Sequence, residues 1–106
     1  MGKYMFHGSL SQTGLEGLVK NGAAARLKAV QALAKSVGGS MESYHFAFGK
    51  DSYYIVCELP SDEAATAVTL AVNASGAATN STTKLLTAQQ VDAALKLSPK
   101  YRAPGK

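Results

Sequence analysis

Two neighbouring runs of mostly apolar residues, 41–48 and 53–59, dominate the hydrophobic pattern of this chain. At the two-residue period of a β-strand, both runs carry apolar side chains on both of their faces. The first run places Tyr44, Phe46 and Phe48 opposite Met41, His45 and Ala47, and the second places Tyr53, Ile55, Cys57 and Leu59 opposite Tyr54, Val56 and Glu58. A sheet with helices on only one face usually shows a polar outer face. The pattern therefore predicts that something covers the second face, and in so short a chain we expect another subunit.

Helix signals and one further strand organise the first third of the chain. Residues 3–8 predict a strand, and Thr13 with Glu16 forms a capping-box pattern that starts a short helix. Asn21-Gly22 predicts a break, because glycine readily adopts the backbone conformation that ends a helix. Apolar residues at spacings of three and four then predict a longer helix over about 23–37.

The second half of the chain continues with alternating strand and helix signals. Ser61 is a helix N-cap, and Thr87 with Gln90 is a second capping box. The expected elements are a hairpin loop at 49–52, a helix after Ser61, a strand at 78–86, a short helix at about 88–97 and an extended tail at 98–106. The inner stripe expected for the helix after Ser61 is Ala64, Ala67, Val68, Ala71 and Val72.

This order of elements, β-α-β-β-α-β with an appended helix, is the ferredoxin-like arrangement. We therefore predict one α+β domain over residues 1–106, with an antiparallel sheet in strand order 4-1-3-2 and helices on one face. The other face is then bare in the monomer, which agrees with cover by a second subunit.

Composition and charge narrow the class of partner. The formal charge is +4, but the eleven basic residues form no run, and four of them lie in the last eleven residues. Nucleic-acid-binding surfaces usually cluster basic residues on one face, so we do not expect a nucleic-acid partner. Cys57 alone excludes an internal disulfide. With no segment reaching the roughly 18–20 apolar residues of a membrane span, and no secretory segment at the N-terminus, we expect a cytoplasmic protein without a membrane partner.

Two histidines, His7 on the first strand and His45 on the second, are the main candidates for chemistry. In the predicted order the third strand separates them by roughly 9–10 Å, whereas a metal lies about 2 Å from its nitrogen ligands. Neither histidine belongs to a metal-binding spacing such as HxH. A shared metal is therefore disfavoured, and a structural histidine or a lone pocket acid or base are the alternatives.

Glu58 is the oddest residue of the third strand, because a carboxylate in an apolar strand is costly unless it is paired. It is a candidate general base with a raised pKa, or else it pairs with a cation such as Arg26 or is hydrated at the end of the strand. Cys57 alternates with apolar residues, which favours a buried small side chain over a nucleophile.

Tyr44 and Tyr54 are the aromatic candidates for a ligand pocket, because a buried tyrosine hydroxyl needs a polar partner. The alternative is that they belong to the core or to a subunit interface. Residues 73–76 and 79–83 bring uncharged polar groups together, but they match neither a P-loop nor a dinucleotide fingerprint. We therefore expect no cofactor, and the spacing of residues supports no Ser-His-Asp arrangement.

Several segments resemble the GYD-domain family. They are 4–26 (YMFHGSLSQTGLEGLVKNGAAAR), the hairpin from Phe48-Gly49 to Glu58-Leu-Pro60, Leu70–Gly76, Thr82-Thr83 and Tyr101-Arg102. The chain keeps Gly49 of the motif that names the family, but it has Asp51 and Ser52 where the pattern commonly has tyrosine and aspartate. The resemblance implies a small bacterial ferredoxin-like protein related in shape to the dimeric α/β barrels, and it implies no particular activity.

Taken together, these patterns predict a homo-oligomeric protein that binds a small molecule in a pocket bordered by the sheet, with catalysis left open. His45, His7 and Glu58 are the candidate proton-handling residues, and Tyr44 and Tyr54 the candidate ligand contacts. The alternative is a non-enzymatic assembly or regulatory module whose apolar sheet face serves only to pair subunits.

Overall fold

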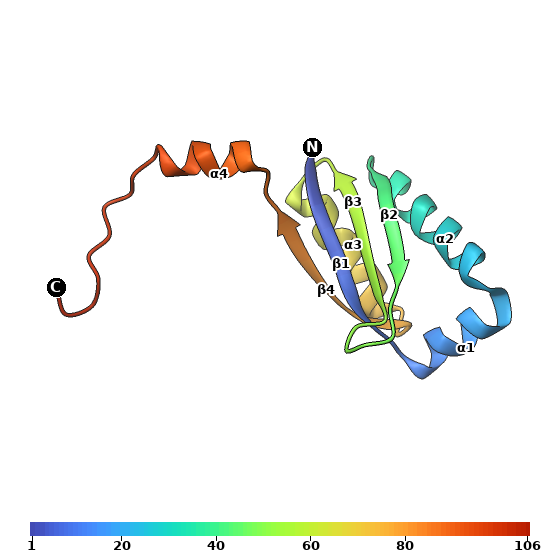
Figure 1. Ribbon diagram of the computed structural model, residues 1–106. Coiled ribbons are helices and arrows are strands. Elements are labelled where there is room, and N and C mark those ends of the chain that lie inside the picture. The colour runs from blue at the N-terminus through green and yellow to red at the C-terminus, as the bar shows by residue number, and fades with distance from the viewer.

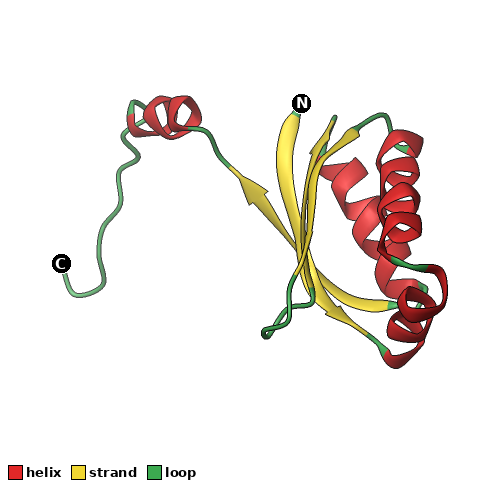
Figure 2. Cartoon of the chain, turned by 45° about the vertical axis from the view of Figure 1, so that its right-hand side comes forward, coloured by secondary structure: helices red, strands yellow, loops and turns green.

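A four-stranded antiparallel sheet carries three helices on one of its faces and leaves the other face uncovered (Figures 1 and 2). The computed structural model describes residues 1–106. Its elements are β1 (Gly2–Leu10), α1 (Gln12–Asn21), α2 (Ala23–Ser36), β2 (Ser40–Phe46), β3 (Tyr53–Leu59), α3 (Asp62–Ala74), β4 (Ala78–Leu85) and α4 (Ala88–Leu95). The protein is thus α+β, consistent with the ferredoxin-like class that the order of elements predicts.

The strands lie in the order β2-β3-β1-β4, so β1 and β3 form the centre of the sheet. All three pairings are antiparallel. Because β1 pairs with β3 on one side and β4 on the other, a residue of β1 has neighbours from two distant parts of the chain. His7, for example, lies between Tyr54 and Ser81.

The core fills the space between the sheet and helices α2 and α3. Alternate residues of the two central strands point into it, and Leu59 is only 1% exposed. The buried apolar residues are Tyr4, Phe6, Val30, Ala34, Tyr53, Ile55, Cys57, Leu59, Ala65, Val68 and Ala78. Burying a large apolar side chain stabilises the fold by about 1.5–3 kcal/mol, so this face carries most of the stability.

Local signals placed most helix boundaries. The predicted break between the first two helices is confirmed at Gly22, whose φ of +87° suits a residue without a Cβ atom. The capping box of Thr87 and Gln90 is also confirmed. The capping box predicted at Thr13 is wrong, because Ser11 is the N-cap of α1 and its Oγ accepts from the backbone N–H of Gly14.

Contacts with the α3–β4 turn explain the earlier start of α1. The backbone N–H of Ser11 donates to the carbonyl of Ala77, and its hydroxyl donates to the carbonyl of Gly76. These two bonds hold Ser11 in the extended conformation that an N-cap requires.

Two expectations about faces are wrong. A register shift between Met41 and Ser43 places Met41 opposite Cys57 on the helix-covered side, not beside His45. In α3 the predicted stripe is correct at Val68, which is buried, and at Ala64 and Val72, which pack against the core. It is wrong at Ala67 and Ala71, which are exposed, because the helix turns Ala65 toward the sheet instead.

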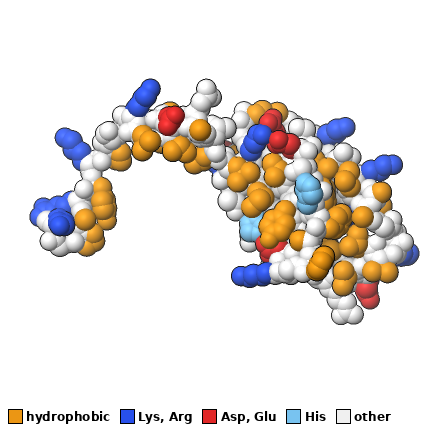
Figure 3. Space-filling view, in the orientation of Figure 1, with side chains coloured by type: hydrophobic (Ala, Val, Ile, Leu, Met, Phe, Trp, Pro, Cys, Tyr) orange, Lys and Arg blue, Asp and Glu red, His pale blue; other side chains and the backbone are white.

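The open face, the side of the sheet without helices, is mixed in character. Met5, Tyr54 and Val56 lie on it together with charged and polar side chains. The expectation of a second face without polar character is therefore wrong, since the strand period brings Lys3, His7, Ser43, His45 and Glu58 to this side. Figure 3 views the open face and shows histidine, acidic and apolar side chains next to one another.

The C-terminal arm, residues 86–106, projects away from the sheet (Figures 1 and 2). It contains α4, which has no buried residue, and an extended tail. Its large apolar side chains are exposed, namely Leu86, Val91, Leu95, Leu97 and Tyr101. The arm gives the molecule a length of 57 Å against 33 and 22 Å in the other directions. None of the four helices is long and apolar enough to cross a bilayer.

Candidate functional site

His7 lies at the centre of the open face, where strand pairing sets its neighbours. Residues opposite one another on adjacent strands point to the same side of a sheet. The pairings His45 with Tyr54, Tyr54 with His7, and His7 with Ser81 therefore form one row across all four strands. Both histidines and Tyr54 thus share one surface.

The ring of His7 is hydrogen-bonded at both nitrogens. Its Nδ1 lies 3.0 Å from Oδ2 of Asp51, and its Nε2 lies 3.2 Å from Oγ1 of Thr83. An ionised carboxylate only accepts hydrogen bonds, so Nδ1 carries the proton. In the neutral ring Nε2 is then an acceptor, and the Thr83 hydroxyl donates to it.

The loop between β2 and β3 positions Asp51 by folding back on β1. The backbone N–H of Ser52 donates to the carbonyl of Gly8 at 2.6 Å, and the Ser9 hydroxyl donates to the carbonyl of Lys50 at 3.0 Å. These two bonds flank Asp51 in sequence and hold its carboxylate next to His7. The hairpin loop is thereby part of the site.

Tyr54 supports His7 from the neighbouring strand. The two rings are nearly parallel, with 13° between their planes and 6.2 Å between their centroids. Tyr54 remains 40% exposed, and His45 on its other side is exposed as well. The row therefore offers aromatic surface and titratable nitrogens to a molecule lying on the open face.

The position of Tyr54 also bears on metal binding. It stands between the two histidines, as the strand order predicts, so the rings do not converge. No group of three histidine, cysteine, aspartate or glutamate side chains lies close enough together to hold a metal ion.

Glu58 shares the open face but lies at its other end. In the strand register it lies opposite Lys3 on β1 and Ser40 on β2. Four residues of β3 separate it from Tyr54, a distance of roughly 13 Å along the strand. Lys3 makes its ion pair with Glu42 at 2.9 Å, and that hydrogen bond raises the pKa of Lys3. The suggested pairing with Arg26 is wrong, because Arg26 lies on the helix-covered side.

Tyr44 is the one candidate that points away from the open face. It lies opposite Ile55 and packs against Phe46 and Tyr53, with ring centroids 4.6 and 6.5 Å away. Its hydroxyl is buried without a hydrogen-bond partner. The structure therefore brings together His7, His45 and Tyr54, and separates Glu58 and Tyr44 from them.

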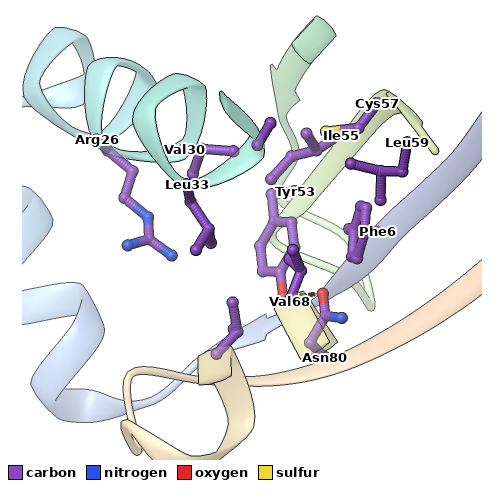
Figure 4. Close-up of a pocket in the computed structure, with 12 residues that line it drawn as sticks. Phe6, Arg26, Val30, Leu33, Tyr53, Ile55, Cys57, Leu59, Val68 and Asn80 are labelled. Atoms are coloured by element: carbon purple, nitrogen blue, oxygen red, sulfur yellow. Dashed lines mark hydrogen bonds between the residues drawn. The ribbon is translucent and has the colours of Figure 1, made fainter. Parts of the chain in front are cut away.

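A small cavity lies on the other side of the sheet, between the core strands and the helices (Figure 4). Its volume is about 20 Å³, room for about one water molecule. In the wall of the cavity Tyr53 donates to Oδ1 of Asn80 at 2.7 Å, and Arg26 lies at the edge of the cavity.

Burial raises the pKa of Tyr53 to about 12 and that of Cys57 to about 11. Cys57 is thus a protonated, buried thiol and does not have the character of a nucleophile.

Sequence reasoning missed Asp51 and Thr83. Asp51 comes from a loop and Thr83 from β4, and both reach His7 only through the folded sheet. A signal was available for Thr83, because the predicted order places the fourth strand beside the first. Nothing local in the sequence indicates how the loop folds over β1.

The fold and this site describe an α+β protein with a helix-covered sheet whose open face carries a hydrogen-bonded histidine. The sequence model of the GYD domain matches residues 4–95, and the chain belongs to this family. A search of curated proteins found no significant match.

Proposed function

We propose that this protein is a homo-oligomer that binds a small molecule on the open face of the sheet, with His7 as its proton-handling group. The observation that carries the proposal is the hydrogen-bonded series Asp51–His7–Thr83 on a face that no helix covers. A reducing, cytoplasmic setting fits the free thiol of Cys57.

The chemistry that this series supports is proton transfer. Asp51 holds the ring in one tautomer, as the carboxylate does beside catalytic histidines in general. Nε2 is then the basic atom, and it faces Thr83 until a ligand hydroxyl or acidic C–H or N–H group takes that place. Tyr54 and His45 would contact the same ligand from the neighbouring strands. Glu58 and Tyr44 lie outside this group and are not part of the proposed contact set.

Oligomerisation would enclose the ligand site, because a second subunit would cover the open face. A ligand pocket usually encloses most of its ligand, and a single sheet face provides only a floor. Two open faces packed against each other, as in a dimeric α/β barrel, would enclose a space lined by His7 of both subunits. Met5, Val56 and Leu85 on the same face provide apolar surface for such a contact.

The alternative function is a non-enzymatic assembly module, and the C-terminal arm favours it. Leu86, Val91, Leu95 and Leu97 are 44–79% exposed, although such side chains gain free energy from burial. If the arm and the open face serve only to join subunits, the interface is dry and His7 has no ligand.

Native mass spectrometry of the untagged, as-purified chain, compared with its denatured mass, tests both functions. We expect a dimer or higher oligomer that carries non-protein mass. Asp51→Asn should retain the oligomer and lose the added mass, because the amide no longer fixes the tautomer of His7. Glu16→Gln, a matched carboxylate-to-amide change on exposed α1, is the control and should behave as the wild type.

The other outcomes separate the alternatives. An oligomer without added mass would reject the ligand-binding function and support the assembly module. A stable monomer would contradict both, since each needs the open face to be covered. Added mass that persists unchanged in the Asp51→Asn variant would remove the histidine series from the ligand site.

A further inference from the structure

Arg26 extends from α2 toward the cavity of Figure 4 without an anionic partner. None of the three ion pairs in the chain involves it, and its Nε is buried with no hydrogen-bond partner. Arg26 as a whole is half-buried, but leaving its buried Nε–H donor unpaired costs free energy that an acceptor would recover. The guanidinium is therefore placed to receive an anion that this chain does not supply.

Arg26 borders apolar surface on its α3 side, whereas toward α1 it borders a hollow that includes Thr13 and Asn21. A groove of about 270 Å³ separates α2 from α3 next to it, and the cavity of about 20 Å³ lies deeper in the core. The groove is lined by Arg26, Ala29, Val30, Leu33, Ala71, Val72 and Ser75. Its volume lies just below the usual range of small-molecule sites, roughly 300–1,000 Å³, which limits the ligand to a small one.

A second buried polar group without a hydrogen-bond partner lies on the same side of the sheet as Arg26. The hydroxyl of Tyr44 is the other buried polar atom without a partner, and Tyr44 packs on Tyr53. Both groups affect the pKa of Tyr53. Burial has the largest effect and raises this pKa, the charge of Arg26 lowers it, and Tyr44 raises it. The region around Tyr53 thus holds one unpaired cation and one free hydroxyl.

We propose that the helix-side groove binds a small apolar carboxylic acid, with its carboxylate on Arg26 and its hydrocarbon part between α2 and α3. A guanidinium binds a carboxylate through two parallel hydrogen bonds, so the anion and the planar fork match in geometry. The apolar lining favours a hydrocarbon part over a sugar or a nucleotide. This site is separate from the proposed function, because the sheet lies between Arg26 and His7.

Calorimetric titration of the full chain with octanoate, octanol and inorganic phosphate tests the proposal. We expect saturable binding of octanoate, and binding of octanol that is at least about tenfold weaker because it lacks the charge. Phosphate alone should bind at least about tenfold more weakly than octanoate, because it gains nothing from the apolar groove.

Variants assign the effect to Arg26. Arg26→Gln should weaken octanoate binding at least about tenfold and Arg26→Lys by less, because the ammonium keeps the charge and loses the two-point geometry. Lys28→Gln, the same loss of charge two residues away on exposed α2, should bind as the wild type. Asp51→Asn should also bind as the wild type, so failure of this site is distinguishable from failure of the open-face site.

Three results would overturn the proposal. These are no binding of octanoate, equal binding of octanol and octanoate, and equal binding of octanoate by folded Arg26→Gln and wild type. Folding of the variant is checked by its unfolding transition, which should not fall, since no partner is lost. If Arg26→Gln fails to fold, chemical shift changes in the wild type must map to α2 and α3 on addition of octanoate, and their absence there overturns the site.

Discussion

The two faces of the sheet are built from the same strands but differ in almost every physical respect. Along β3, Tyr53, Ile55, Cys57 and Leu59 are nearly inaccessible, whereas the intervening Tyr54 is 40% exposed. The helix-covered face holds mainly apolar side chains, and its fully buried side-chain hydrogen bond joins Tyr53 to Asn80. The open face holds both histidines and the hydrogen bonds of His7 to Asp51 and Thr83. One face therefore stabilises the fold, which leaves the other free to carry chemistry.

The titratable groups of the two faces also differ in their access to solvent. Burial raises the pKa of Tyr53 and of Cys57, so both groups stay protonated at neutral pH. His7 keeps access to solvent, with about a quarter of its side chain exposed, and its carboxylate partner is exposed to the same extent. The hydrogen-bonded pair of His7 and Asp51 is therefore accessible from solvent, whereas Tyr53 and Cys57 are enclosed in the core.

Truncation of Leu59 gives the largest expected contrast between the faces. Leu59→Ala should lower the free energy of unfolding by about 2–5 kcal/mol, because it removes buried contacts and leaves a cavity. Val56→Ala, on the open face of the same strand, should cost less than about 1 kcal/mol in the monomer. Urea denaturation followed by circular dichroism measures both. If the Val56 variant loses as much as the Leu59 variant at high protein concentration, the open face is covered in solution.

The sequence predicted this two-faced sheet well where local rules decide the structure. The break at Gly22, the cap at Ser61 and the capping box at Thr87 are properties of a few adjacent residues, and all three are present. The alternation of β3 is likewise visible in its sequence. By contrast, the N-cap of α1 depends on hydrogen bonds from Ser11 to the α3–β4 turn, which no local pattern encodes.

The candidate site was predictable only in part for the same reason. The predicted strand order placed the third strand between His7 and His45, and the structure shows that Tyr54 is the residue of that strand in their row. The partners of His7 depend on the fold of the β2–β3 loop, and the side on which Met41 lies depends on a bulge. Both are tertiary features that the period of two does not contain.

A change of pH should remove part of the contrast by charging the buried face. The pKa of the Cys57 thiol is raised from 9.0 to about 11, so the native state holds this proton more tightly than the unfolded state. Its contribution to stability is complete below pH 9 and declines as the pH rises toward 11. By pH 11 the loss amounts to about 2 kcal/mol.

Cys57→Ala isolates this contribution. The variant lacks the thiol, so its free energy of unfolding should decline less than that of the wild type between pH 8 and pH 11, measured in urea with a reductant present. Tyr53 contributes to the remaining decline of both proteins, because its pKa is raised from 10.0 to about 12. Parallel curves for wild type and variant would mean that the thiol is hydrated.

The smallest expected effect comes from two adjacent tyrosines that point to opposite faces. Tyr53→Phe removes the donor to Oδ1 of Asn80, a bond of 2.7 Å in the core, and leaves that oxygen buried without its partner. We expect a loss of about 1.5 kcal/mol in the free energy of unfolding. Tyr54→Phe removes a hydroxyl from the open face, and its effect should stay within about 0.5 kcal/mol.

The variants Tyr53→Phe and Tyr54→Phe also distinguish an effect on stability from an effect on ligand retention. Tyr54→Phe keeps the ring that stacks on His7, so any change that it causes in ligand retention comes from the hydroxyl alone. Tyr53→Phe should leave ligand retention unchanged, because its side chain lies below the sheet. A Tyr54 variant that loses more stability than the Tyr53 variant would mean that the hydroxyl of Tyr54 is buried against a partner, and the two faces would then be equally enclosed in the assembled protein.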